Sequence, residues 1–409
     1  MASVLAWLDH DLRAQEETLR LFSQFQEKES RDELGISAIR DSFADQLFPG
    51  TSTIQTRLRY MLFIPWMYQK LEGKRTPAES FARIADQQER SLFKPLLASR
   101  DPAGAFGKHS GQNLKRLPGS IYWSGLGRWK IRLIDCSQDE YHRRVDELYR
   151  CRDAIAAREN KEKIRGDDVD PEQRKIALSW HSSLPPAPDD FPAGASFDLT
   201  REEASFLSDR IQASCPGSLL AHLALNSEEV SVNFPWEHPG YASFPDNLKT
   251  LLTHARLFSE IMYAAALSYN VQLARKSNLT ALARDHEERF AAWLTTLPYN
   301  DIRNWQPQAL WEAVCQPGHS VSYKTRLFIE QWLGHIQHSP ETLLSDENAL
   351  ALIRQREIEL KGARSRFKNQ LALDMWQGYA GTGKLAYRWN TVRTFLNDLA
   401  LGFKGKEVC

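Results

Sequence analysis

Two segments of the chain concentrate basic side chains in a way that suits a polyanionic ligand. Residues 107–134 contain no acidic side chain. Their cations are Lys108, Lys115, Arg116, Arg128, Lys130 and Arg132. The aromatic residues Tyr122, Trp123 and Trp129 lie among them. Cations neutralise the phosphates of a nucleic-acid backbone and exposed aromatic rings stack on bases, so this segment is predicted to bind nucleic acid.

Residues 361–393 form the second basic segment, in which Asp374 is the only acidic residue. Its cations are Lys361, Arg364, Arg366, Lys368, Lys384, Arg388 and Arg393. We expect Arg364, Arg366 and Arg388 to contribute to a nucleic-acid-binding surface. For both segments the alternative is that the cations pair with acids of other helices, because clustered Lys and Arg indicate nucleic-acid binding without proving it.

Residues 31–66 have the pattern of two helices joined by a tight turn. Apolar residues at positions 36, 39, 43 and 47 lie on one face of a helix that begins near Ser37. The Pro-Gly pair at 49–50 ends this helix, and a hydroxyl of residues 51–53 can cap the next. The segment is therefore predicted to be a helical hairpin.

Two interpretations of this hairpin stay open. The first turns of its second helix carry Arg57 and Arg59, which makes it a candidate DNA-reading helix. Residues 60–66 are almost wholly apolar, however, and a helix that is apolar on every side is normally buried. We favour a buried hairpin, in which Arg57 and Arg59 pair with acidic residues. The acidic candidates are Asp32, Asp41 and Asp45.

Other chemical motifs are incomplete. Residues 378–384, GYAGTGK, match part of a phosphate-binding loop, but Leu385 replaces the hydroxyl that would hold Mg²⁺, so a loop between helices is favoured. His335 and His338 lie three residues apart with no recognisable third metal ligand. We predict no metal site and no cofactor, and we name no catalytic residue. For an enzyme, the best candidates are His181, Asp189 and Asp190 in a proline-rich region.

Helical periodicity dominates the rest of the chain and predicts a mainly α fold of two or three helical subdomains with few short strands. Capping-box patterns at 76–79, 137–140 and 200–203 mark helix starts, and residues 216–218 start another helix. The longest predicted helix covers 246–276. Further helices are predicted at 279–297, 309–315, 321–335, 346–361 and 387–401, and a short strand at 176–180.

Length and composition predict a multidomain globular protein. The chain has 409 residues, with 52 Lys and Arg against 52 Asp and Glu, so a charged partner must bind local patches. Residues 158–177 are rich in charge and poor in apolar side chains, which predicts a linker or an exposed helical extension. We therefore expect an N-terminal helical domain at 1–157 and a C-terminal one at 178–409, with a possible subdivision near 245.

The cysteines and the apolar segments predict a cytoplasmic location. The five cysteines show no paired spacing, which favours free thiols in a reducing compartment. The first residues, MASVLAWLDHDLR, lack the basic and apolar regions of a secretory signal. The apolar run at 261–267 is far shorter than the roughly 20 residues of a membrane span, so no membrane partner is expected.

Several sequence blocks resemble a bacterial family known as the domain of unknown function numbered six-three-six-one. They are WLD at 7–9, RDELG at 31–35, FPGTSTIQTRLRY at 48–60 and YRW at 387–389, with Val392 and Asp398 after them. The similarity runs over nearly the whole chain. It implies no activity and no catalytic residues, but it does imply an association with prokaryotic defence islands.

Together these observations predict a non-catalytic protein that binds nucleic acid, or a nucleic-acid-processing partner, as an accessory component of a bacterial anti-phage defence system. The first alternative is a nuclease or other hydrolase whose site is not recognisable from the sequence. The second is a structural subunit that binds other proteins of a defence operon.

Overall fold

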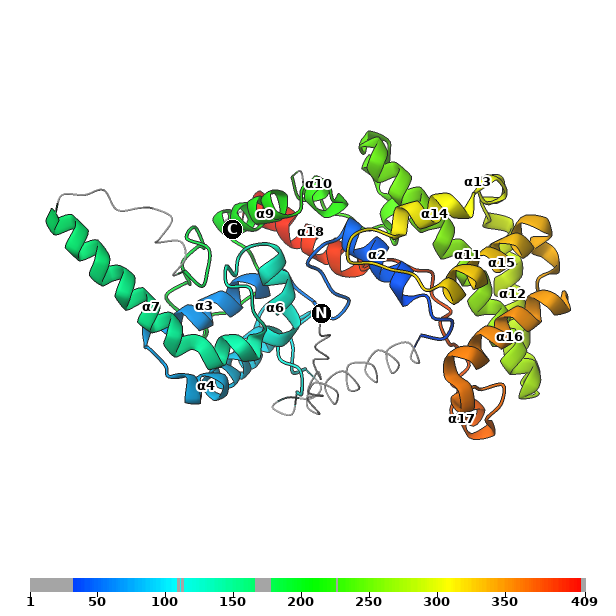
Figure 1. Ribbon diagram of the computed structural model, residues 1–409, viewed down its shortest axis with the longest axis horizontal. Coiled ribbons are helices and arrows are strands. Elements are labelled where there is room, and N and C mark those ends of the chain that lie inside the picture. The colour runs from blue at the N-terminus through cyan, green and yellow to red at the C-terminus, as the bar shows by residue number, and fades with distance from the viewer. Residues whose placement is uncertain (1–31, 109–110, 112–113, 166–177, 226, 406–409) are drawn as a thin grey trace, which may run out of the picture. The chain divides into compact units, whose positions relative to one another are not determined.

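A computed structural model describes residues 32–108, 111, 114–165, 178–225 and 227–405, with side chains for all except 159–165. The regular structure of these residues is helical (Figure 1). Within them, the β pairing consists of one antiparallel bridge between Arg132 and Trp180, where a short strand was expected. The predicted mainly α class is confirmed.

The described residues fold into two compact units. Unit 1 contains residues 32–43 and 249–385, and unit 2 contains those of 44–248 and 386–405. Most of the predicted linker at 158–177 lies outside the described residues, as do the WLD block at 7–9 and Cys409. The predicted domain boundaries at 157 and 178 therefore stay a prediction.

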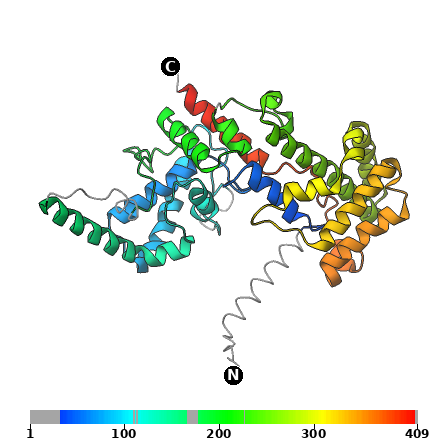
Figure 2. The ribbon, with the colours of Figure 1, turned by 45° about the horizontal axis from the view of Figure 1, so that its top comes forward.

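Unit 1 is built along the helix α11 (Asp246–Lys276), which covers the residues predicted for the longest helix. Trp332 on α15 donates from Nε1 to the carbonyl oxygen of Ile261 on α11, at 2.7 Å. Figure 2 shows the long green α11 beside the yellow and orange helices. These helices are α12 (Thr280–Thr296), α13 (Tyr299–Asn304), α14 (Pro307–Val314), α15 (Tyr323–His338), α16 (Glu347–Lys361) and α17 (Gln370–Asp374).

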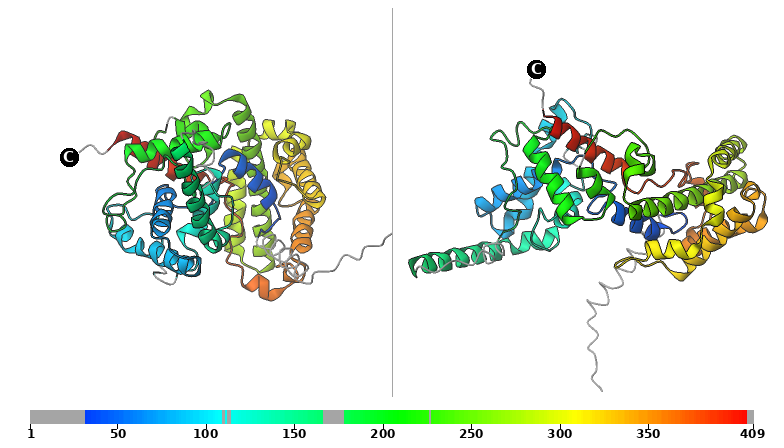
Figure 3. Two further views of the ribbon diagram at one scale, coloured as in Figure 1. Left: turned by 60° about the vertical axis from the view of Figure 1, so that its left-hand side comes forward. Right: turned by 90° about the horizontal axis from the view of Figure 1, so that it is seen from above.

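Unit 2 has a core of aromatic side chains between helices. Tyr68 of α3 packs against Trp123 of α6 and Tyr141 of α7, with ring centroids 5.5 and 5.6 Å apart. Figure 3 shows that α7 extends beyond the other helices of this unit. The helices are α3 (Tyr60–Gly73), α4 (Ala78–Ser91), α5 (Phe93–Ala98), α6 (Pro118–Arg128), α7 (Gln138–Arg165), α9 (Arg201–Ser214), α10 (Leu219–Leu225) and α18 (Trp389–Lys404).

The predicted helix starts are at the right places, but one of the caps differs. Thr200 and Glu203 form the expected capping box of α9, and the hydroxyl of Ser137 accepts from a backbone N–H of α7. The predicted box at 76–79 does not form. Instead, the Asp146 carboxylate of α7 accepts from the backbone N–H of Ala78, at 3.2 Å. A neighbouring helix thus caps α4.

The expected helical hairpin is wrong in its second half. Helix α2 (Ser37–Leu47) forms as predicted, but α3 begins only at Tyr60, and residues 50–59 form turns and irregular structure. The backbone N–H groups of Thr56 and Arg57 bond to the hydroxyl of Tyr122, at 2.8 and 3.1 Å. Because distant side chains satisfy these donors, the segment has no need of helical hydrogen bonds.

Four cysteines of the described residues, Cys136, Cys151, Cys215 and Cys315, are free thiols, as expected. None of the helices in the described part of the chain is both long enough and apolar enough to cross a bilayer.

Candidate nucleic-acid interface

Five cations of the first basic segment are exposed in the chain before, at the end of and just after α6, a helix that the sequence patterns do not indicate. Within the described part of the chain, none of the five forms an ion pair or a side-chain hydrogen bond. Since α6 has 11 residues, Lys115 and Arg116 are separated from Arg128 and Lys130 by a helix roughly 16 Å long. We call them the cationic strip: Lys108, Lys115 and Arg116 before α6, Arg128 at its end and Lys130 just after it.

Two segments from elsewhere in unit 2 hold the C-terminal end of the strip. The hydroxyl of Ser214, at the end of α9, donates to the carbonyl oxygen of Trp129 at 2.9 Å. The backbone N–H of His181 donates to the carbonyl oxygen of Ile131 at 2.8 Å. The residues around Lys130 are therefore fixed between α9 and residue 181.

These contacts bring a further cation close to the strip. Arg210 lies one helical turn before the end of α9, and its charge adds to the burial that lowers the pKa of His181. Burial raises the pKa of Cys215 to about 11, and the nearby charge of Arg128 opposes this shift. Arg210 thus belongs to the same region as Arg128, although no sequence signal connects two residues so far apart in the chain.

The aromatic residues of this segment are in the core and do not form a surface for base stacking. Tyr122 and Trp129 are fully buried, and Trp123 is 6% exposed. The indole N–H of Trp129 donates to the carbonyl oxygen of Pro49, and that of Trp123 to the carbonyl oxygen of Cys136. The expectation that these three rings stack on bases is therefore wrong, since stacking needs an open ring face.

Arg132 differs from the other cations of the segment because it is buried. Its side chain donates to the carbonyl oxygen of Ile134, and its guanidinium carbon lies 4.8 Å from the ring centre of Trp123. Burial lowers the pKa of Arg132. This arginine supports the core around α6 and does not reach a ligand at the surface.

Arg57 and Arg59 are also buried, and each has an acidic partner. The guanidinium of Arg57 bonds to Asp398 at 2.8 Å and to Asp101 at 2.6 Å. Arg59 bonds to Glu203 at 2.7 Å. Ion pairing is confirmed for both arginines, but Asp32, Asp41 and Asp45 are not the partners. A DNA-reading role is excluded for this arrangement, because neither side chain is exposed and no helix carries them.

The second basic segment is mostly neutralised. In unit 1, Glu33 pairs with Lys361 and Arg366, and Glu260 pairs with Lys384. In unit 2, Arg388 pairs with Asp45 at 2.6 Å, and Arg393 donates to carbonyl oxygens. Arg364 and Lys368 are exposed without an ion pair in the described residues. Of the three predicted contacts in this segment, only Arg364 is available to a polyanion.

The loop at 378–384 is occupied by contacts within unit 1. The backbone N–H of Ala380 donates to Asn270 at 2.8 Å, and that of Leu385 to Ser259 at 2.9 Å. Lys384 pairs with Glu260 at 2.7 Å. The segment is a loop between α17 and α18, with no strand before it among the described residues, which is the interpretation that the sequence favoured.

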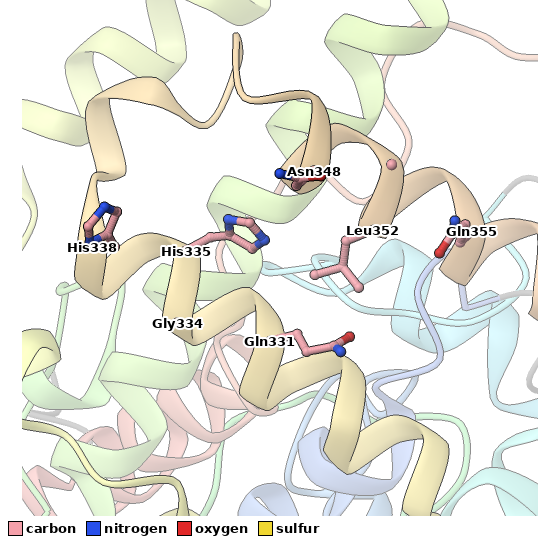
Figure 4. A pocket seen from close by; sticks show the side chains of 8 residues that line it. Gln331, Gly334, His335, His338, Asn348, Leu352 and Gln355 are labelled. Carbon is pink, nitrogen blue, oxygen red and sulfur yellow. The ribbon is translucent and has the colours of Figure 1, made fainter.

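A polar groove of about 550 Å³ lies between α15 and α16 (Figure 4). His335 Nδ1 lies 3.0 Å from a carboxylate oxygen of Asp346, and the other oxygen of Asp346 accepts from the backbone of Asn348 at the start of α16. Such a pair can orient an imidazole as a proton acceptor. The residues that line the groove include no Ser, Thr or Cys to serve as a nucleophile.

The remaining enzyme candidates do not form a site. His181 accepts from the backbone N–H of Ser183, and its ring contacts Phe206. No hydrogen bond or ion pair joins His181 to Asp189 or Asp190 in the part of the chain that is described. Among the described residues, no three side chains of His, Cys, Asp or Glu are placed to hold a metal ion.

A protein-family model described as "Family of unknown function (DUF6361)" matches residues 2–402. No curated protein and no solved structure matches the chain.

Proposed function

Because the chain belongs to the DUF6361 family, whose function is unknown, we propose a function from its structure: it binds nucleic acid through the cationic strip of unit 2. One observation carries the proposal. The chain has equal numbers of acidic and basic residues, yet five cations within residues 108–130 are exposed without an acidic partner in the described residues. Most other cations of the two basic segments are paired or buried.

The chemistry of the strip favours contacts to the phosphate backbone. Lys and Arg bind phosphates regardless of base sequence, and the buried rings of Tyr122, Trp123 and Trp129 add no stacking surface. Arg210, whose charge acts on His181, adds a cation near the C-terminal end of the strip. We therefore expect binding that depends strongly on salt and weakly on sequence.

The proposed biological role is that of a non-catalytic accessory component of a bacterial anti-phage defence system. The family resemblance is the support for this part of the proposal. In such a system the strip would hold the nucleic acid on which a partner protein acts.

A mobility-shift titration tests the proposal. Duplex DNA, single-stranded DNA and RNA of mixed sequence are titrated at several salt concentrations between roughly 50 and 200 mM. If all five cations contact phosphates, the logarithm of the association constant falls with the logarithm of salt concentration, with a slope of about −4.5 for duplex DNA and about −3.5 for single strands. Absence of binding at low salt, or binding that does not depend on salt, contradicts the proposal.

Hydrolysis is the second candidate function, because Asp346 orients His335 at an open groove. A nuclease and phosphatase assay of the wild-type protein and of His335→Ala tests it, with Lys384→Ala as a control outside the groove. Activity that His335→Ala removes and Lys384→Ala retains supports hydrolysis. If neither nucleic-acid binding nor hydrolysis is found, co-purification with defence-operon proteins tests the role of a structural subunit.

A further inference from the structure

Helix α6 begins against a buried carboxylate. Glu89 on α4 is 1% exposed, and its Oε2 accepts a hydrogen bond from the backbone N–H of Gly119 at 2.6 Å. Gly119 is the second residue of α6, where backbone N–H groups have no partner within the helix. A Cβ atom on Gly119 would lie 2.3 Å from Glu89 Oε1. Helices α4 and α6 therefore meet directly at this carboxylate.

The same short stretch of α4 also holds the segment before α6. The guanidinium of Arg90 donates to the carbonyl oxygen of Leu114 at 3.2 Å. Lys115 and Arg116 of the cationic strip lie between Leu114 and Gly119. Two adjacent residues of α4 thus attach both ends of the segment that carries these cations. We call Glu89, Arg90, Leu114 and Gly119 the α4–α6 junction.

The groups that face Glu89 come from three helices. On α4 they are Asp86 and Arg90, whose charges respectively favour and oppose protonation of Glu89. On α3 they are the hydroxyls of Tyr60 and Tyr68. On α7, Gln138 and His142 both bond to the hydroxyl of Tyr68. Glu89 forms no ion pair with any of these groups or with another described residue.

Glu89 is the member of this cluster that changes charge near neutral pH. Burial raises its pKa to about 7, against the opposing hydrogen bond from Gly119. Burial lowers the pKa of His142, which favours its neutral form, and raises the pKa of both tyrosines. A single proton therefore determines whether the junction contains a buried negative charge.

We propose that the α4–α6 junction is a proton-sensitive control of the cationic strip. With Glu89 protonated, the junction is closed and fixes Lys115 and Arg116. With Glu89 ionised, the junction opens enough to hydrate the carboxylate, because a buried charge without a cationic partner is unfavourable, and the two cations lose their fixed position. The effect on ligand binding rests on the proposed function, whereas the opening itself does not.

Amide hydrogen exchange between pH 6 and pH 8, corrected for the intrinsic exchange rate, tests the opening. In the wild-type protein we expect protection of residues 119–122 to fall about tenfold at pH 8, since one pH unit above the pKa changes the equilibrium by that factor. In Glu89→Gln, which cannot ionise, protection should stay constant. The first turn of α9, capped by Thr200, is the internal reference.

A second variant makes the test independent of the folding of Glu89→Gln. Asp86→Asn keeps Glu89 but removes a negative charge that raises the pKa of Glu89, so the loss of protection should occur at lower pH than in the wild-type protein. Equal protection of the wild-type α6 at pH 6 and pH 8, or a change that Glu89→Gln also shows, overturns the proposal.

Binding measurements separate this inference from the proposed function. If the strip binds nucleic acid, wild-type affinity should fall between pH 6 and pH 8 more steeply than that of Glu89→Gln. If no nucleic acid binds at any pH, the proposed function fails while the exchange experiment still decides whether the junction opens.

Discussion

Asp398 on α18 accepts hydrogen bonds from the guanidinium of Arg57, at 2.8, 3.0 and 3.2 Å, and another from the backbone N–H of Leu58, at 2.9 Å. The two charged residues are 341 positions apart in the sequence, and both are buried. One carboxylate therefore fixes both the side chain and the backbone of the irregular segment before α3.

Replacing this carboxylate should destabilise unit 2. Asp398→Asn leaves Arg57 with only the more exposed Asp101, and breaking a buried ion pair costs about 3 kcal/mol or more. Urea unfolding at neutral pH measures the loss. Asp153→Asn is the matched control, because Asp153 pairs with Arg75 at the exposed surface, and it should leave the unfolding curve unchanged. Equal effects of the two substitutions would contradict this account of Asp398.

Tyr122→Phe should lower stability without changing ligand affinity. The Tyr122 hydroxyl bonds to the backbone N–H groups of Thr56 and Arg57 and to the carbonyl oxygen of Arg57. Its removal leaves buried backbone groups unpaired, at a cost of about 2 kcal/mol. Thermal unfolding and a mobility-shift titration of the folded variant measure the two effects. A large loss of affinity at unchanged stability would mean that this ring contacts the ligand.

Removing cations of the strip should weaken nucleic-acid binding and its salt dependence together. Each of Lys115→Ala, Arg116→Ala and Arg128→Ala should reduce the salt slope by about 1. Lys130 has a positive φ of 55°, so Lys130→Asn is the better substitution there, because Asn tolerates this conformation.

The control for these variants is Arg144→Ala. Arg144 is an exposed cation of α7 in the same unit, but it pairs with Glu140 and Glu147. The Arg144→Ala variant should bind nucleic acid with the same affinity and salt dependence as the wild-type protein. If Arg144→Ala weakens binding as much as the strip variants do, the binding reflects total charge and the strip has no special role.

Glu89→Gln should remove one component of the pH dependence of stability. The folded-state pKa of Glu89 is raised to about 7 from an ordinary value of 4.5. The folded state therefore binds the proton more tightly than the unfolded state does between these two pH values. The contribution of the Glu89 carboxyl to the free energy of unfolding is fully present below pH 4.5, decreases as the pH rises, and is lost above about pH 7.

The measurement is the free energy of unfolding of both proteins between pH 5 and pH 8. The wild-type protein should lose up to about 3 kcal/mol relative to Glu89→Gln over this range, since each unit of pKa shift corresponds to 1.36 kcal/mol. The difference in unfolding free energy between the two proteins cancels the contribution of the buried histidines. Their lowered pKa values give a pH dependence of opposite sign. If the difference in unfolding free energy between the two proteins does not change with pH, ionisation of Glu89 does not destabilise the folded state.

Much of the fold follows from local patterns. The long apolar face at 246–276 predicts α11, and the Thr200 and Glu203 pattern predicts the start of α9, because periodicity and capping depend on nearby residues. These local patterns give wrong predictions where side chains from distant parts of the sequence satisfy the backbone hydrogen bonds. Residues 50–59 are irregular because Tyr122 and Asp398 satisfy their backbone donors, and α4 is capped by Asp146.

The candidate interface was predictable only in part. The absence of acidic residues at 107–134 identifies the right stretch of chain, but the stretch contains both exposed cations and the buried Arg132. Burial depends on how α6 packs, which its composition does not reveal. Arg210 joins this region through a contact between residues 85 positions apart, so no local signal could have indicated it.

The sequence by itself determined the helical class, most helix positions and the family, because each depends on residue types and their spacing along the chain. Only the tertiary structure decided which charges remain available to a ligand. An ion pair such as that of Arg57 with Asp398 forms through space, so whether an arginine is neutralised depends on the residues that folding brings beside it.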